Sequence, residues 1–170
     1  MEMNREFTAS EVREILVRLF PHRRCVLSQL TLFSQMGIAK PSGVSVVRKR
    51  TCYVLADVLN IACIFDLKER GISLSEMGDL PAQIRNFAST ILFDKVPQCI
   101  AAGFGNAVSL DFGDRALESL PMKLMLEENS GAGFFWSYDV TSIAKELLAV
   151  ATSYINEVDI LVGQDILAQA

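Results

Sequence analysis

Apolar side chains recur at helical spacing in the first stretch of the chain. Thr8 and Glu11 stand three positions apart, the spacing of a capping box, and predict that a helix begins between them. Pro21 predicts that this helix has ended by that point. The apolar positions at i, i+3, i+4 and i+7, which predict the buried face, are Val12, Ile15, Leu16 and Leu19.

A second, shorter helix follows a basic connector. Leu27, Leu30 and Phe33 fall on one side of it, and Gly37 is placed to close it in a left-handed cap. After a Lys-Pro-Ser-Gly turn, the stretch "VSVVRKRTCYV" alternates and is rich in β-branched residues, which predicts a two-stranded ribbon. Its basic triplet, 48–50, is expected near the tip or along the returning strand.

A third helix is predicted from Leu55 to Arg70, with Gly71 as its stop. Ser73 and Glu76 form a second capping-box pair, which predicts a short helix ending before Pro81, and residues 82–92 fit another helix. Beyond residue 94, "NAVSLDF", "MKLML" and "GFFWSY" are predicted strands, with "NSGAG" as a hairpin turn between the last two.

The final helix is expected to start at Asp139 or Thr141. One face of it carries Ile143, Leu147, Val150 and Tyr154. The predicted class is therefore α+β, with a helical winged unit over residues 5–88 and a small α+β unit over 94–170. The boundary falls at roughly residues 84–95.

Charge is distributed unevenly along the chain. The net charge is −4, yet residues 1–50 contain nine Lys/Arg against four Asp/Glu, whereas residues 81–170 contain five against eleven. A basic N-terminal part joined to an acidic part favours a partner for the former that carries phosphate.

Two stretches resemble the DNA-binding domain of the MerR family of bacterial transcriptional regulators. "SQMGIAKPSG" is similar to the end of that family's recognition helix and its Lys-Pro-Ser turn, and "RKRTCYVLADVLNIACIFDLKERGISLSEM" is similar to its wing and second helix pair. The recognition helix departs from the family pattern, with Thr31-Leu32-Phe33 in place of an Arg-Tyr-Tyr type of triplet. A divergent member with a small C-terminal domain is the closest comparison.

The resemblance implies a recognition helix in the major groove of double-stranded DNA and a basic wing on the phosphates. The side chains that would reach base edges are Ser28, Gln29, Thr31 and Gln35. The cations that would contact phosphates are Arg23, Arg24, Lys40, Arg48, Lys49 and Arg50. The expected function is transcriptional regulation by a homodimer that associates through residues 95–170, where the small domain serves dimerisation or sensing.

An alternative stays open at this stage. Leu32 on the outward side of the second helix suits a protein partner better than a DNA groove, and a basic triplet on a surface turn is often no more than a solvated face. The same fold would then be an interaction module, or adaptor, with weak or lost DNA binding.

Other classes of function receive little support. No GxSxG, P-loop, GxGxxG or HExxH motif is present, and one histidine with four scattered cysteines offers neither an acid–base set nor a metal site. We therefore expect no enzyme activity, cofactor or metal. The most apolar stretch is too short to span a membrane, and the cysteine pattern favours reduced thiols and a cytoplasmic location.

Overall fold

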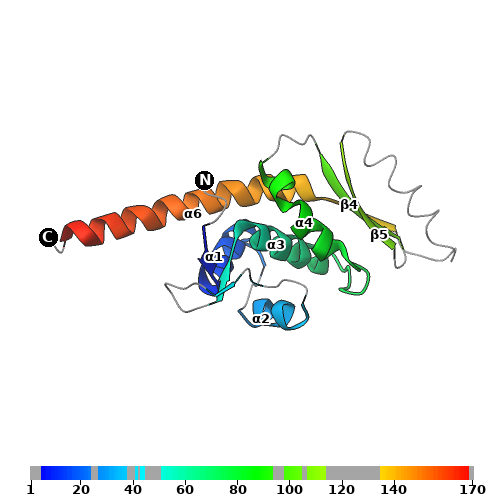
Figure 1. Ribbon diagram of the computed structural model, residues 1–170, viewed down its shortest axis with the longest axis horizontal. Coiled ribbons are helices and arrows are strands. Elements are labelled where there is room, and N and C mark those ends of the chain that lie inside the picture. Colours follow the sequence, from blue (N-terminus) through cyan, green and yellow to red (C-terminus); the bar gives the residue numbers. More distant parts are fainter. Residues whose placement is uncertain are drawn as a thin grey trace.

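The computed structural model describes residues 5–23, 27–37, 41, 43–44, 51–93, 98–104, 107–113 and 135–168. Within these ranges the chain is a mixed α+β structure with two small sheets, which confirms the predicted fold class. Helices α1, α3, α4 and α6 stack against one another, one sheet lies at the end of the stack, and α2 lies below α1 and α3 (Figure 1) and adds Leu30 and Phe33 to the same core.

The N-terminal helix forms as predicted. Strand β1, Phe7–Thr8, leads into α1, Ala9–Leu19. The Thr8 amide donates to Glu11 Oε2 at 2.6 Å and the Glu11 amide donates to Thr8 Oγ1 at 3.3 Å, so both halves of the capping box are present. The four apolar positions predicted for its buried face are all buried.

Helix α2 runs Leu27–Gln35. Gly37 follows it as the predicted stop, with a φ of 72° in the left-handed region. Strands β2, Gly43–Val44, and β3, Thr51–Tyr53, pair antiparallel, with Val44 opposite Thr51. The ends of the predicted ribbon are therefore confirmed, and residues 45–50 lie outside the described part. Strand β1 adds to the other edge of β3 and completes the order β1-β3-β2.

Helix α3, Leu55–Glu69, occupies its predicted range, and Gly71 follows it with a φ of 89°. The prediction for the next segment was wrong in part. Ser73 and Glu76 exchange their capping hydrogen bonds, yet residues 74–79 form turns and no short helix. Helix α4 runs Leu80–Phe93 and contains Pro81 in its first turn, where a missing amide hydrogen costs no helical hydrogen bond.

The second sheet has the order β5-β4-β6 and is antiparallel throughout. Strands β5, Ala107–Phe112, and β6, Phe135–Asp139, fall in two of the predicted stretches. The central strand β4, Cys99–Phe104, was not predicted. The predicted strand "MKLML" and the "NSGAG" turn lie outside the described residues.

Helix α6, Val140–Ala168, begins at the predicted place, where the Ser142 amide donates to Asp139 Oδ1 at 3.1 Å. It continues through the apolar stretch near the C-terminus and extends beyond the body of the molecule (Figure 1). Arg18 of α1 binds Glu157 at 2.9 Å, and Arg5 binds Asp159 at 3.3 Å, so α6 lies along the N-terminal segment. In the described residues, no helix is long and apolar enough to cross a membrane.

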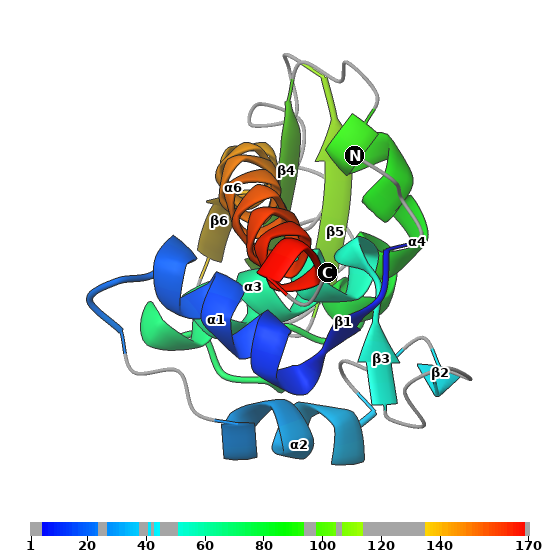
Figure 2. The same ribbon diagram turned by 90° about the vertical axis from the view of Figure 1, so that its left-hand side faces the viewer.

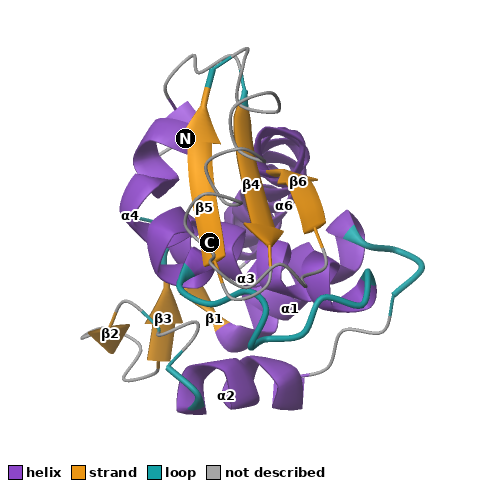
Figure 3. Cartoon of the chain, turned by 90° about the vertical axis from the view of Figure 1, so that its right-hand side faces the viewer, coloured by secondary structure: helices purple, strands orange, loops and turns teal. Residues whose placement is uncertain are grey.

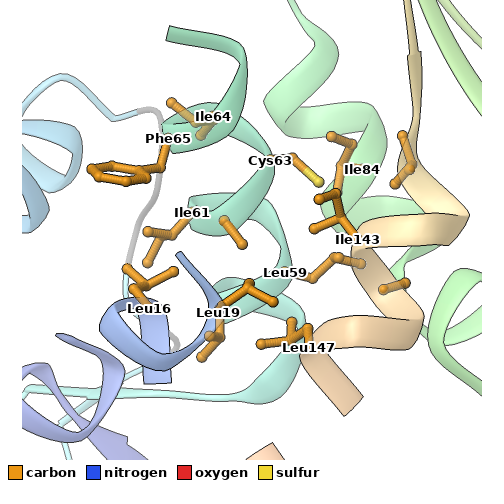
Figure 4. Packing of buried hydrophobic residues seen from close by; sticks show 14 of the residues in the cluster. Leu16, Leu19, Leu59, Ile61, Cys63, Ile64, Phe65, Ile84, Ile143 and Leu147 are labelled. Atoms are coloured by element: carbon orange, nitrogen blue, oxygen red, sulfur yellow. The ribbon is translucent and has the colours of Figure 1, made fainter. Parts of the chain in front are cut away.

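One hydrophobic cluster joins the two units expected from the sequence. Leu16 and Leu19 of α1 and Leu59 of α3 converge with Ile143 and Leu147 of α6 (Figure 4). Trp136 and Tyr138 of β6 belong to the same cluster. The helices of residues 5–88 therefore use the start of α6 as one wall of their core.

Candidate nucleic-acid interface

The polar face of α2 is exposed while its apolar face is buried. Leu30 and Phe33 are almost fully buried, and the Lys68 ammonium of α3 lies 5.5 Å from the Phe33 ring centroid. The residues predicted to reach base edges lie together with Leu32 on one open surface of the helix, the α2 face; they are Ser28, Gln29, Thr31 and Gln35. Four candidate residues from the sequence are thus brought together on one surface.

The α2 face lies at one end of the molecule, beside the β2–β3 ribbon. Two opposite views place α2 and the ribbon at the same end, below α3 and the second sheet (Figures 2 and 3). A helix that packs on the body through one face and exposes the other, with a ribbon beside it, has the shape needed to enter the major groove of DNA while the ribbon follows the backbone.

Helix α2 and the turn that follows it each expose one large apolar side chain. Leu32 is 44% exposed and Met36 is 51% exposed. Both values are high for apolar residues on so small an element. They give the face a mixed character that also suits contact with a protein.

Most of the predicted phosphate-binding cations lie outside the described residues: Arg24, Lys40, Arg48, Lys49 and Arg50. The ribbon strands that flank residues 45–50 are the described part of this predicted wing.

Arg23, the remaining predicted phosphate contact, is not part of the α2 face. Its guanidinium donates from Nη1 to the carboxylate of Asp66, which is 1% exposed, and lies 4.9 Å from the Phe20 ring centroid. Arg70, one turn further along α3, donates from Nε to the other oxygen of Asp66 at 2.9 Å. A buried carboxylate is tolerated because two cations and their hydrogen bonds surround it.

These three residues border a cavity of about 380 Å³ that sequence reasoning missed. Its other walls come from the start of α6 and from β6, which includes Tyr138. The one signal in the sequence was an aspartate four positions before an arginine, inside the most apolar helix of the chain. The Arg23 contact spans 43 positions and had no local signal.

The described cysteines show no metal-binding or disulfide arrangement. Cys52, Cys63 and Cys99 are free and buried, and no group of three metal-ligating side chains occurs among the residues that the structure describes. Burial raises the pKa of the Cys63 thiol and raises that of Cys99 to about 12. Both thiols are therefore neutral and poor nucleophiles at pH 7.

Comparison with known proteins does not place the chain in a family. No known protein family matches the sequence, and no curated protein is similar to it.

Proposed function

We propose that the protein is a DNA-binding transcriptional regulator with a winged helix-turn-helix of the MerR type. The observation that carries this proposal is the α2 face, on which four polar side chains expected to read base edges lie together. Their position beside the β2–β3 ribbon supports it further (Figure 2).

In this mechanism α2 enters the major groove, where short hydroxyl and amide side chains distinguish base pairs by their donor and acceptor patterns. The cations of residues 48–50, with Arg24 and Lys40, neutralise phosphates on either side. The phosphate contacts supply most of the affinity and the α2 contacts supply the sequence preference. A regulator of this kind works in the cytoplasm.

The regulator acts as a homodimer. Helix α6 is held to the N-terminal segment as far as Asp159 and extends beyond it, with Ile160 60% exposed (Figure 1). A projecting helix with apolar side chains gives a second copy a surface on which to pack, so that two heads meet adjacent half-sites on DNA. Sedimentation of a monomer at micromolar concentration would contradict this part of the proposal.

Fluorescence anisotropy with a mixed-sequence DNA duplex tests DNA binding. We expect the affinity of the natural chain to fall steeply as the salt concentration rises. When Arg48, Lys49 and Arg50 are changed to alanine, the slope of log affinity against log salt concentration should become shallower by about one unit per cation removed. Lys145→Ala, which removes an exposed cation of α6, is the matched control and should leave the slope unchanged. The absence of binding at low salt would overturn the proposal.

The α2 face is tested separately from the wing. Ser28→Ala combined with Gln35→Ala removes two exposed polar groups of α2 without changing its charge. We expect the salt slope to stay as in the natural chain and the preference among duplex sequences to weaken, because base contacts carry preference and phosphate contacts carry the slope.

The second candidate function is an interaction module for another protein, which the exposure of Leu32 and Met36 favours. In that case the natural chain shows no salt-dependent DNA binding. Leu32→Ser then abolishes capture of a partner protein while the fold is kept, because the Leu32 side chain is 44% exposed and lies outside the core.

A further inference from the structure

The cavity beside Asp66 combines features that the DNA-binding proposal does not use. Its volume of about 380 Å³ lies in the range of small-molecule sites. Four parts of the chain meet around it: the connector after α1, the end of α3, strand β6 and the start of α6. Charges of opposite sign occupy different elements around it.

One wall is basic. Arg23 and Arg70 share the buried Asp66 carboxylate, so this wall has one positive charge in excess. Within the described contacts, the hydrogen bond from Arg70 to Asp66 uses only Nε, and the side chain is 59% exposed. A guanidinium has four further N–H groups on its two terminal nitrogens, which form the planar fork that binds a carboxylate.

A second wall is acidic and comes from the end of β6 and the start of α6. Asp139 and Glu146 both line the cavity, with the hydroxyl-bearing Ser142 between them in sequence. Asp139 caps the helix through its hydrogen bond from the Ser142 amide. Glu146, by contrast, is exposed and has no ion-pair or hydrogen-bond partner among the described residues.

The buried side chain of Tyr138 lies beside the basic wall. The Tyr138 side chain, 4% exposed, lines the cavity, and the Arg70 guanidinium lies 5.5 Å from its ring centroid. In the described structure its hydroxyl meets no group with hydrogen-bond geometry. Burial raises the pKa of this phenol, and the neighbouring Cys63 and Asp66 raise it further, so it remains a proton donor. The hydroxyl oxygen is closed off from the cavity, so the phenol contributes its ring to the wall beside Arg70.

We propose that this cavity binds a free α-amino acid. The ligand carboxylate binds the terminal nitrogens of Arg70. Its ammonium group binds Glu146 and Asp139. Phe20 and Ile143, which also line the cavity, contact the ligand side chain. This assignment does not depend on DNA binding.

The charge of the two walls selects a zwitterion. A ligand with only a carboxylate would bind the basic wall, but no positive charge would then offset the negative charges of Asp139 and Glu146 near it. A ligand with only an amine would face the excess positive charge of the basic wall. Like charges held close together are unfavourable, so a molecule that carries both groups is favoured over either.

Thermal-shift and calorimetric titrations of the full chain test the site. The probes are the twenty protein L-α-amino acids, and the one that binds best is compared with its analogue lacking the amino group and its analogue lacking the carboxylate. We expect one molecule bound per chain and a loss of about tenfold or more in affinity for each analogue, the effect of one charged hydrogen bond.

Glu146→Gln is the informative variant because it removes the acidic charge without touching the Asp66 cluster. We expect a loss of about tenfold in affinity for the amino acid, a gain in affinity for the analogue without an amino group, which no longer meets the Glu146 charge, and an unchanged melting temperature of the free protein. Glu6→Gln, at an exposed position outside the cavity, is the matched control and should bind as the natural chain does. Failure of all twenty amino acids to bind at millimolar concentration, or binding of either analogue as tightly as the amino acid, would overturn the proposal. Loss of DNA binding in the anisotropy experiment would leave it standing.

Discussion

At the scale of the residue, the buried thiols couple the stability of the fold to pH. Cys99 is fully buried in β4, and burial raises its pKa from 9.0 to about 12. The thiol is neutral in the folded state over a range in which it ionises in the unfolded chain. Its contribution to stability is therefore complete below about pH 9 and is lost as the pH rises toward 12.

Cys99→Ala removes this dependence. Between about pH 9 and pH 10, we expect the free energy of unfolding of the natural chain to fall by about 1 kcal/mol more than that of the variant, since each pH unit is worth 1.36 kcal/mol per group. Urea titrations followed by circular dichroism at both pH values measure the difference. The two proteins should run parallel between about pH 7 and pH 8, and parallel behaviour up to pH 10 would contradict the prediction.

Residue chemistry also shows how far the candidate site was predictable. The polar face of α2 could be assigned from the sequence because Leu30 and Phe33 define its buried side by local spacing. The partner of Arg23 could not, because Asp66 is distant in the chain and only the packing of α1 against α3 brings them together. An arginine in a basic connector is ordinarily a surface residue, so its sequence context pointed toward solvent and phosphate.

At the scale of the element, the helices were easier to predict than the strands. Helix α1 has a local period and a capping box, and α3 has a local period and a glycine after its end; both formed where expected. Strand β4 gave no such signal, because it lies between β5 and β6 and its small apolar residues are buried on both faces. Alternation marks a strand with one wet face and one dry face, and a central strand of this kind has no wet face.

The glycine in β4 has a packing reason. Gly103 stands directly opposite Trp136 of β6, and a Cβ added at Gly103 would lie 2.4 Å from the indole ring. The ring therefore covers the glycine backbone. Glycine is unfavourable in the interior of a strand, but here it leaves the room that the Trp136 ring of the neighbouring strand occupies.

Gly103→Ala should destabilise the protein by about 1–3 kcal/mol, because the ring must move out of a packed position. Chemical denaturation followed by circular dichroism measures this loss. In a Trp136→Leu background the same substitution should cost much less, since the clashing ring is gone. Equal costs in both backgrounds would show that the close approach is not the cause.

At the scale of the whole molecule, the shared core bears on how the two expected units behave. Units over residues 5–88 and 94–170 that fold separately would each have a core of their own. In the structure, Leu16 and Leu59 pack in one cluster with Leu147, and Trp136 belongs to that cluster as well (Figure 4). We therefore expect the chain to unfold in one cooperative transition.

The sole tryptophan makes this expectation testable. Trp136 lies in β6, whereas Ile15 is fully buried in α1, on the other side of the expected boundary. Ile15→Ala should lower the free energy of unfolding by about 2–5 kcal/mol, the usual cost of such a truncation in a core. In a cooperative molecule, tryptophan fluorescence and far-ultraviolet circular dichroism report the same shifted transition. In a molecule of two independent units, the Trp136 transition stays in place while circular dichroism becomes biphasic. Coincident transitions would also mean that a ligand bound beside Asp66, where the connector after α1 meets the start of α6, stabilises the head and the C-terminal sheet together.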